Sequence, residues 1–311
     1  MLSTVAERLY WAARYLERVE NTARLVKVYT NLILDVPDGM NVGWYNLIEL
    51  NSCREQFDKR FKNRTERNVV KFLLADPSNF CSLTSALNAV RENIRTSRDE
   101  MPVETWEQVN ELHIFVKNNV QKGLNRSKRH EFLNGVIQGC QQLNGLLSGT
   151  MSQGAGWQFL RVGRNLERAD MTTRILDAGV TAVMQTADAE IASNINQLVW
   201  GNVLDSLSAY IPYRKVMRTA VNGEDVTQFL VEDPHFPRSL HFCFDHMQNA
   251  VSQLPRHEKV IKQIEKMSKQ AIKDVDYGKL DQHFRDYLND IQISLGDMHF
   301  QFAETWFPND A

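Results

Sequence analysis

Two short runs of acids and arginines, 150 residues apart, are the parts of this sequence best suited to chemistry. The first run contains Glu17-Arg18 and the second contains Glu167-Arg168. Arginines can hold carboxylates or phosphates through paired hydrogen bonds, and paired carboxylates can transfer protons. Further charges stand at matching places around both pairs: Arg14, Glu20 and Arg24 in the first run, and Arg164, Asp170 and Arg174 in the second.

On helices that turn about 100° per residue, these charges lie to one side of an apolar stripe in both runs. A side chain at such a border is partly buried, and its charge needs a partner. Two interpretations stay open: ordinary salt bridges along each helix, or a shared polar cleft for a ligand or partner. Because the pattern is repeated, we expect the two helices to pack together around an approximate twofold axis, with their acid-arginine edges facing a common groove.

A metal site is a weaker interpretation of the same acids. Glu17-x-x-Glu20 resembles the carboxylate motifs of metal-binding bundles, but those bundles place a histidine three residues after a glutamate, and neither run does so. The sequence also contains no GxSxG, Walker, GxGxxG or HExxH motif. We therefore expect no metal and no cofactor on this chain, and no catalytic residue can be assigned.

A third polar segment covers residues 91–98 and includes Glu92 and Asn93. Its arginines, Arg91, Arg95 and Arg98, would share one face of a helix. That face could hold an anion, or it could be a solvated basic surface that pairs with neighbouring acids.

The elements that position these residues are predicted to be helices. Leu9, Leu16 and Val19 belong to an apolar series with steps of three and four, and residues 284–302 repeat the pattern. No alternating strand pattern stands between turn signals. We expect an all-α bundle of about a dozen helices, with breaks near Pro37-Asp38-Gly39, Asp76-Pro77, Pro102, Gly154 to Gly156, Asn222-Gly223, Asp233 to Pro237, Pro255 and Gly278.

An internal repeat organises these helices. The Glu-Arg runs recur at a spacing of 150 residues, and Phe72 to Pro77 is echoed by Phe229 to Pro234 at a spacing of 157. We therefore predict two duplicated, pseudo-symmetric halves, residues 1–150 and 151–311, that pack as one unit.

Composition narrows the class of protein. A net charge of −2 over 311 residues gives no reason to expect nucleic-acid binding. The four cysteines lack metal-ligand spacing, so we expect reduced, buried thiols, as is typical of a cytoplasmic protein. Charges at Glu7, Arg8 and Arg14 interrupt any signal-peptide core, and no run is apolar enough to span a membrane.

Five segments together resemble the bacterial Alpha-E family, a helical domain named for its Glu-Arg motif. They cover the chain almost from end to end: Ala6 to Arg24 (AERLYWAARYLERVENTAR), Arg91 to Asn110 (RENIRTSRDEMPVETWEQVN), Gly156 to Asp177 (GWQFLRVGRNLERADMTTRILD), Tyr210 to Arg214 (YIPYR) and Phe236 to Leu240 (FPRSL). The motif carried onto this sequence points to Glu17, Arg18, Glu167 and Arg168, then to Glu92, Asn93, Arg95 and Arg238.

The resemblance implies a partner role. Alpha-E proteins typically accompany a circularly permuted ATP-grasp protein and a transglutaminase-like protein, so ATP and Mg²⁺ would belong to the ligase. The leading hypothesis is an accessory or substrate-binding protein for an amide or peptide ligase, whose cleft holds a peptide, carboxylate or phosphate. The alternatives are an enzyme that uses the paired acids and arginines, or a structural scaffold. A homo-oligomer stays possible.

Overall fold

The computed structural model describes residues 2–35, 43–184, 189–273 and 275–308, with the backbone alone for residues 34–35 and 189–194. Within these ranges the chain forms fourteen α-helices, one short 3-10 helix and no strand, which confirms the predicted all-α class. The break expected at Pro37-Asp38-Gly39 falls outside them. None of the described helices is both long enough and apolar enough to cross a membrane.

The helices follow one another in two series of seven. The first series comprises α1 (Ser3–Asp35), α2 (Asn46–Leu50), α3 (Arg54–Arg60), α4 (Glu66–Leu74), α5 (Leu83–Arg95), α6 (Val103–Leu124) and α7 (Arg126–Thr150), with the 3-10 helix Arg98–Glu100 before α6. The second comprises α8 (Ala155–Met184), α9 (Ala189–Ser206), α10 (Tyr210–Val216), α11 (Gly223–Glu232), α12 (Leu240–Val251), α13 (Glu258–Ile272) and α14 (Gln282–Trp306).

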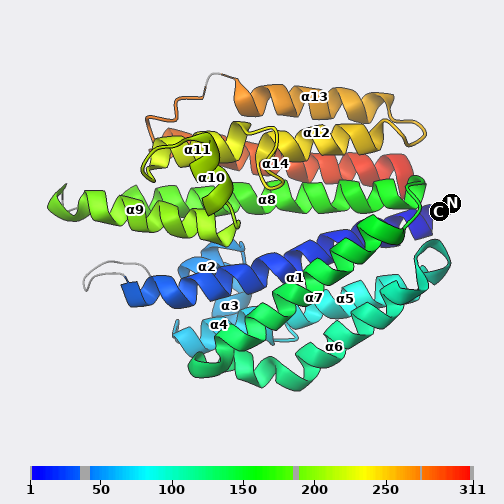
Figure 1. Cartoon of the computed structure of the whole chain (residues 1–311), viewed down its shortest axis with the longest axis horizontal. Helices are drawn as coiled ribbons and strands as arrows, with labels where there is room; N and C mark the ends of the chain where they lie inside the picture. The colour runs from blue at the N-terminus through cyan, green and yellow to red at the C-terminus, as the bar shows by residue number, and fades with distance from the viewer. Residues whose placement is uncertain (1, 36–42, 185–188, 274, 309–311) are drawn as a thin grey trace.

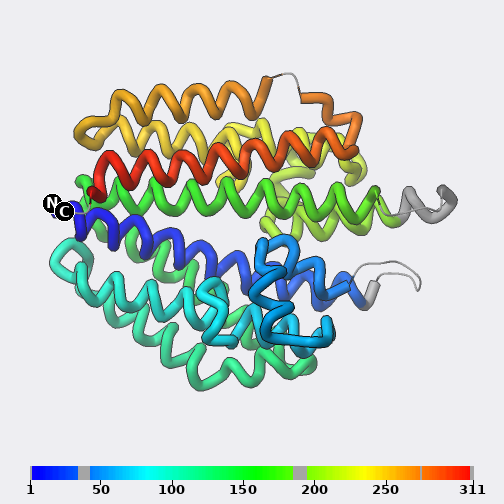
Figure 2. The backbone as a smooth tube through the Cα atoms, turned by 180° about the vertical axis from the view of Figure 1, so that it is seen from behind, coloured from blue at the N-terminus to red at the C-terminus, as the bar shows by residue number. Residues whose placement is uncertain are grey.

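The long helices α1 and α8 lie side by side through the middle of the molecule and pack against each other (Figure 1). Helices α5, α6 and α7 lie on the α1 side, and α12, α13 and α14 lie on the α8 side. α1 packs on α5 and α7, and α8 packs on α12 and α14. Seen from behind, the start of α1 and the end of α14 lie at the same end of the molecule (Figure 2).

The predicted apolar stripes form the core. All seven stripe residues of α1 are buried: Leu9, Ala12, Ala13, Leu16, Val19, Ala23 and Val26. The six of α14 are buried as well: Phe284, Leu288, Ile291, Leu295, Met298 and Phe302. Both stripes belong to one hydrophobic cluster that runs through the chain, as expected for helices whose apolar face is wide enough to cover neighbours.

Six of the described helices begin at a polar side chain that caps the first turn, and two of these caps are Asn125 before α7 and Asp281 before α14. Thr65 and Ser82 each accept the backbone N–H three residues further on, at the starts of α4 and α5. Asn222 and Ser239 do the same at the starts of α11 and α12. Such caps satisfy N–H groups that have no partner within the helix.

These capped helices occupy the same places in the two series. Thr65 and Asn222 are 157 residues apart, as are Ser82 and Ser239. α3 and α10 each have seven residues, and α7 and α14 each have 25. The matching elements support the predicted duplication, which stays a prediction together with the division into halves 1–150 and 151–311.

Candidate functional site

The two Glu-Arg pairs meet where α1 and α8 come closest. A Cβ atom on Gly163 would lie 2.3 Å from the backbone oxygen of Tyr10, so a glycine is needed for this approach. Glu17 and Glu167 are only 1% and 2% exposed. The expected packing of the two motif helices is thus confirmed. The expectation that the glutamates lie at a partly exposed border is wrong, because arginines enclose them between the helices.

Glu167 of α8 is held by two arginines of α1. Arg18 donates from Nε to Oε1 at 2.6 Å, and Arg14 donates from Nε to Oε2 at 2.9 Å. Burial alone would raise the pKa of Glu167, but the two guanidinium groups outweigh burial and lower the pKa to about 2. Arg14 also donates to the hydroxyl of Tyr10, which is hydrogen-bonded to Nδ1 of His299.

Glu17 of α1 is held from the other half of the chain. Nη1 of Arg238 donates to Oε1 at 2.6 Å, and Nε of Arg168 lies 3.1 Å from Oε2. Burial again opposes ionisation, yet Arg168 and Arg238 lower the pKa of Glu17 to about 2. Arg238 also donates to Asn21 and to Glu20, so one guanidinium ties three side chains of α1 together.

Each Glu-Arg pair therefore forms ion pairs with residues on the helix that carries the other pair. Arg18 of the first pair binds Glu167 of the second, and Arg168 of the second lies against Glu17 of the first. Burying such charges is tolerable only when every carboxylate has cationic partners, because an isolated buried ion is strongly destabilising.

Two outer pairs stay within their own helices. Arg24 binds Glu20 at 2.7 Å and donates to the hydroxyl of Ser208. Arg174 binds Asp170 at 2.8 Å and donates to Ser52. Both serines have positive φ angles, 55° for Ser208 and 56° for Ser52, which non-glycine residues seldom adopt.

We name these eleven side chains the charge cluster: Arg14, Glu17, Arg18, Glu20, Arg24, Arg164, Glu167, Arg168, Asp170, Arg174 and Arg238. Its seven arginines exceed its four carboxylates by three positive charges. Six of the arginines contact a carboxylate. Over the described part of the chain, the seventh, Arg164, has neither an ion pair nor a hydrogen bond.

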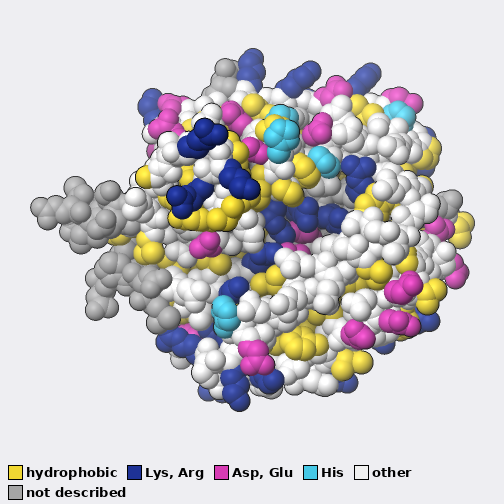
Figure 3. All heavy atoms as spheres, in the orientation of Figure 1, with side chains coloured by type: hydrophobic (Ala, Val, Ile, Leu, Met, Phe, Trp, Pro, Cys, Tyr) yellow, Lys and Arg dark blue, Asp and Glu magenta, His cyan; other side chains and the backbone are white. Residues whose placement is uncertain are grey.

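A cleft of about 1190 Å³ opens beside the charge cluster. Arg24 belongs to its lining, together with residues of α1, α7, α9 and α10. Four cations line it, Arg24, Lys27, Arg214 and Arg218, against the single carboxylate of Asp205. Figure 3 shows this face hollowed near its middle, between α8 and α7, with Lys and Arg side chains in the hollow.

The segment of residues 91–98 does not join the charge cluster. Glu92 and Arg95 are exposed and pair with each other at 2.6 Å, and Asn93 is partly buried beside them. Arg98 lies past the end of α5, with its guanidinium carbon 3.9 Å from the centre of the Trp106 ring. Because α5 ends at Arg95, the three arginines do not share one helix face as expected, but Arg91 and Arg98 both lie over the Trp106 ring, at 5.0 Å and 3.9 Å.

Several residues of the site were not singled out from the sequence. Asn21 and Ser208 supply uncharged partners, and Lys27, Arg214 and Arg218 line the cleft. Their local spacing carries no signal, since isolated basic residues on helices are usually solvated. Two of these residues lie within segments that resemble the Alpha-E family: Asn21 in Ala6 to Arg24, and Arg214 in Tyr210 to Arg214.

Cys81 lies against the charge cluster, and its thiol accepts a hydrogen bond from Nη1 of Arg18 at 3.5 Å. A hydrogen bond from Cys53 and the charge of Arg18 lower the pKa of Cys81 to about 6. Cys140 and Cys243 are buried, and burial raises their pKa values. The expectation of four buried thiols holds for three, while Cys81 is partly exposed.

Three known proteins are similar in sequence to this chain. Uncharacterized proteins of Mycobacterium bovis and of two strains of Mycobacterium tuberculosis are each 21% identical over 272 residues. The matches cover 81% of this chain but 30% of each relative, so the chain spans less than a third of their length. No solved structure matches.

A family model described as an alpha-helical domain with a conserved ER motif matches residues 1–307. Both Glu-Arg pairs lie inside the matched range, at the centre of the charge cluster. The chain belongs to the Alpha-E family.

Proposed function

We propose that this chain is an accessory or substrate-binding protein for an ATP-grasp amide or peptide ligase, and that its cleft holds an anionic group of the substrate. The excess of positive charge on the lining of the cleft supports the binding of an anionic group. Arg24, Lys27, Arg214 and Arg218 face it with one opposing carboxylate, Asp205. Guanidinium groups bind carboxylates and phosphates in pairs of parallel hydrogen bonds.

The size and backbone of the cleft support a ligand larger than a single metabolite. Its volume of about 1190 Å³ exceeds the range of about 300–1,000 Å³ that is usual for small molecules. Ser208 and Arg218, both on the lining, have positive φ angles of 55° and 57°. Strained backbone of this kind is frequent at binding sites, where the surrounding structure holds it in place.

The acids of the charge cluster favour a binding role over the alternative of an enzyme with paired carboxylates. General acid-base catalysis near neutral pH needs groups that titrate there, and acid-base pairs have pKa values moved apart. The pKa values of Glu17 and Glu167 are instead lowered together to about 2. Both stay ionised at neutral pH and form ion pairs with the arginines around them.

The partner follows from the family resemblance. A circularly permuted ATP-grasp protein would bring ATP and Mg²⁺, and a transglutaminase-like protein would act on the product. In this arrangement the Alpha-E chain would present the substrate to the ligase. A purely structural scaffold would need no cationic cleft, so the charge of the lining favours a binding protein over a scaffold.

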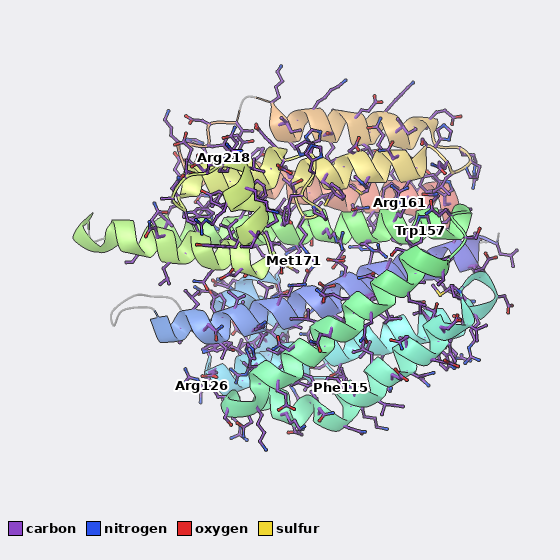
Figure 4. All side chains as sticks on the ribbon, in the orientation of Figure 1. Phe115, Arg126, Trp157, Arg161, Met171 and Arg218 are labelled. Atoms are coloured by element: carbon purple, nitrogen blue, oxygen red, sulfur yellow. The ribbon has the colours of Figure 1, made fainter. Side chains whose placement is uncertain are left out.

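Co-purification with the ATP-grasp protein of the same organism tests the proposal. We expect a complex at micromolar concentration, measured by sedimentation velocity with and without ATP and Mg²⁺. The double variant Arg214→Glu/Arg218→Glu should keep the complex but raise the KM of the ligase for its acceptor substrate. Arg126→Glu, on the first turn of α7 and away from the cleft, is the matched control (Figure 4). Failure to form any complex would contradict the proposal.

A further inference from the structure

Arg164 differs from every other arginine of the charge cluster. It is partly exposed on α8, with Glu17 and Glu20 nearby, lies outside the lining of the cleft, and has no acidic partner among the described residues. We propose that Arg164 is the anchor for a carboxylate group of the bound ligand, such as the C-terminus of a peptide. This inference rests on the proposed function and assigns its ligand class.

The surroundings of Arg164 leave its charge uncompensated. Glu17 and Glu20 are the nearest acids, but Arg168, Arg238 and Arg24 already bind them. Burial, and then the like charge of Arg168, lower the pKa of Arg164 to about 10. At neutral pH the side chain is still a cation, and an oxyanion placed beside it would complete its hydrogen bonds.

Arg14, at the matching place in the first run, shows what this position can bind. Arg14 and Arg164 are 150 residues apart, and Arg14 holds the carboxylate of Glu167 at 2.9 Å. By the same correspondence, Arg164 would hold Glu17. In this half, however, Arg238 takes Glu17 at 2.6 Å. The arginine position that binds an internal carboxylate in the first half is therefore open in the second.

The cause of this asymmetry lies in one substituted position. At the spacing of 157 residues that relates α5 to α12, Arg238 corresponds to Cys81. A thiol brings no positive charge, so Arg14 is needed to neutralise Glu167. Arg238 does supply a positive charge to Glu17, so Arg164 is not needed to neutralise that carboxylate. Of the two matching arginines, Arg14 therefore binds an internal carboxylate, whereas Arg164 can bind the carboxylate of a ligand.

The neighbours of Arg164 suit a peptide carboxylate. Arg161, Arg164 and Arg168 follow one another at steps of three and four, so they share one face of α8. The guanidinium carbon of Arg164 lies 5.8 Å from the centre of the Trp157 ring, which offers an apolar surface beside the charge. Figure 4 labels Trp157 and Arg161 at the beginning of α8, and Figure 3 shows basic side chains in the hollow between α8 and α7.

Calorimetric titration with defined probes tests the anchor. The probes are N-acetyl-trialanine with a free carboxylate, its C-terminal amide, and inorganic phosphate. We expect the free carboxylate to bind the wild type, and Arg164→Gln to weaken binding at least about tenfold, as loss of a charge-assisted pair does. The amide should not bind measurably. Arg126→Gln, an exposed arginine at the start of α7, should bind like the wild type.

A second readout separates an anchor from a structural arginine. Without ligand, Arg164→Gln should melt at the same temperature as the wild type or higher, because the substitution removes an uncompensated charge. With saturating carboxylate probe, the wild type should gain melting temperature and the variant should not. A lower melting temperature of the ligand-free variant would overturn the proposal, since it would show that Arg164 already has a stabilising partner.

The binding of the probes to the wild type and the variants decides between the anchor and the proposed function. Equal binding of the carboxylate probe by the wild type and Arg164→Gln would overturn the anchor, while loss of binding in Arg214→Glu/Arg218→Glu would keep the proposed function. Binding of phosphate without the carboxylate would overturn the ligand class. Absence of binding by any probe would overturn the anchor, and complex formation with the ligase would then decide the proposed function separately.

Discussion

Arg18 and Glu167, which are 149 residues apart in the sequence, form a buried ion pair at 2.6 Å across the interface of α1 and α8. Neither residue pairs with the other member of its own Glu-Arg motif. The motif therefore acts between helices: the arginine of the run on α1 neutralises the acid of the run on α8. This exchange lets two acids stay ionised in the interior of the protein.

Removing one of these acids should destabilise the fold. Glu17→Gln would leave Arg168 and Arg238 without their shared carboxylate in a buried place. We expect the free energy of unfolding to fall by about 2 kcal/mol or more, measured by urea denaturation. Glu92→Gln removes the acid of an exposed pair and should leave stability near that of the wild type. Equal stability of both variants would show that the buried pairs contribute little.

Stability should also depend on pH in the acidic range. The pKa values of Glu17 and Glu167 are lowered from the ordinary 4.5 to about 2 in the folded protein. The contribution of these ionised carboxylates to the free energy of unfolding is therefore fully present above about pH 4.5 and is lost as the pH falls toward 2. The urea midpoint should decline over this window, and it should decline less in Glu167→Gln. An identical decline in that variant would argue against the pKa shift of Glu167.

Gly163 should tolerate no side chain. A Cβ there would overlap the backbone oxygen of Tyr10, so Gly163→Ala must push α1 and α8 apart. We expect a loss of about 1–3 kcal/mol, as for other overpacked sites. Gly145→Ala, on a stretch of α7 with nothing within 4 Å of the new Cβ, should instead gain up to about 1 kcal/mol from helix propensity. Similar effects at both glycines would contradict the close approach.

Cys81 should be the most reactive of the four thiols. Its pKa is lowered to about 6, and it is partly exposed, whereas Cys140 and Cys243 are buried with raised pKa values. Iodoacetamide at pH 7 should therefore modify Cys81 first, because the thiolate is the reacting form. Peptide mass mapping over time measures the order, and Cys81→Ser should remove the fast phase. Modification of Cys140 at the same rate would contradict this prediction.

The helices could be predicted from the sequence because their signals are local. Asn222 and Ser239 cap helices, Pro102 precedes one, and the apolar stripes repeat at helical steps. The break at Asn125 between α6 and α7 was missed, since one residue serves both as the end of the first helix and as the cap of the second. No proline or glycine follows it to mark the turn.

The partners within the site depended on information that is not local. Spacings of three and four allow salt bridges along one helix, and Arg24–Glu20 and Arg174–Asp170 are such pairs. Glu167 lies three residues after Arg164 yet pairs with Arg14 and Arg18 of α1, because the close approach at Gly163 brings α1 within reach. The register between the two helices decides these contacts. The sequence of either helix alone is compatible with a salt bridge within that helix and with one to the other helix.

A double-mutant cycle on Arg18 and Glu167 tests the exchange between the motifs most directly. The free energies of unfolding of Arg18→Met, Glu167→Gln and the double variant give the coupling energy of this pair. We expect a coupling energy of at least about 2 kcal/mol, because each single substitution leaves an unpaired group in the buried interface. Additivity within about 0.5 kcal/mol would contradict it, since the two residues would then contribute independently.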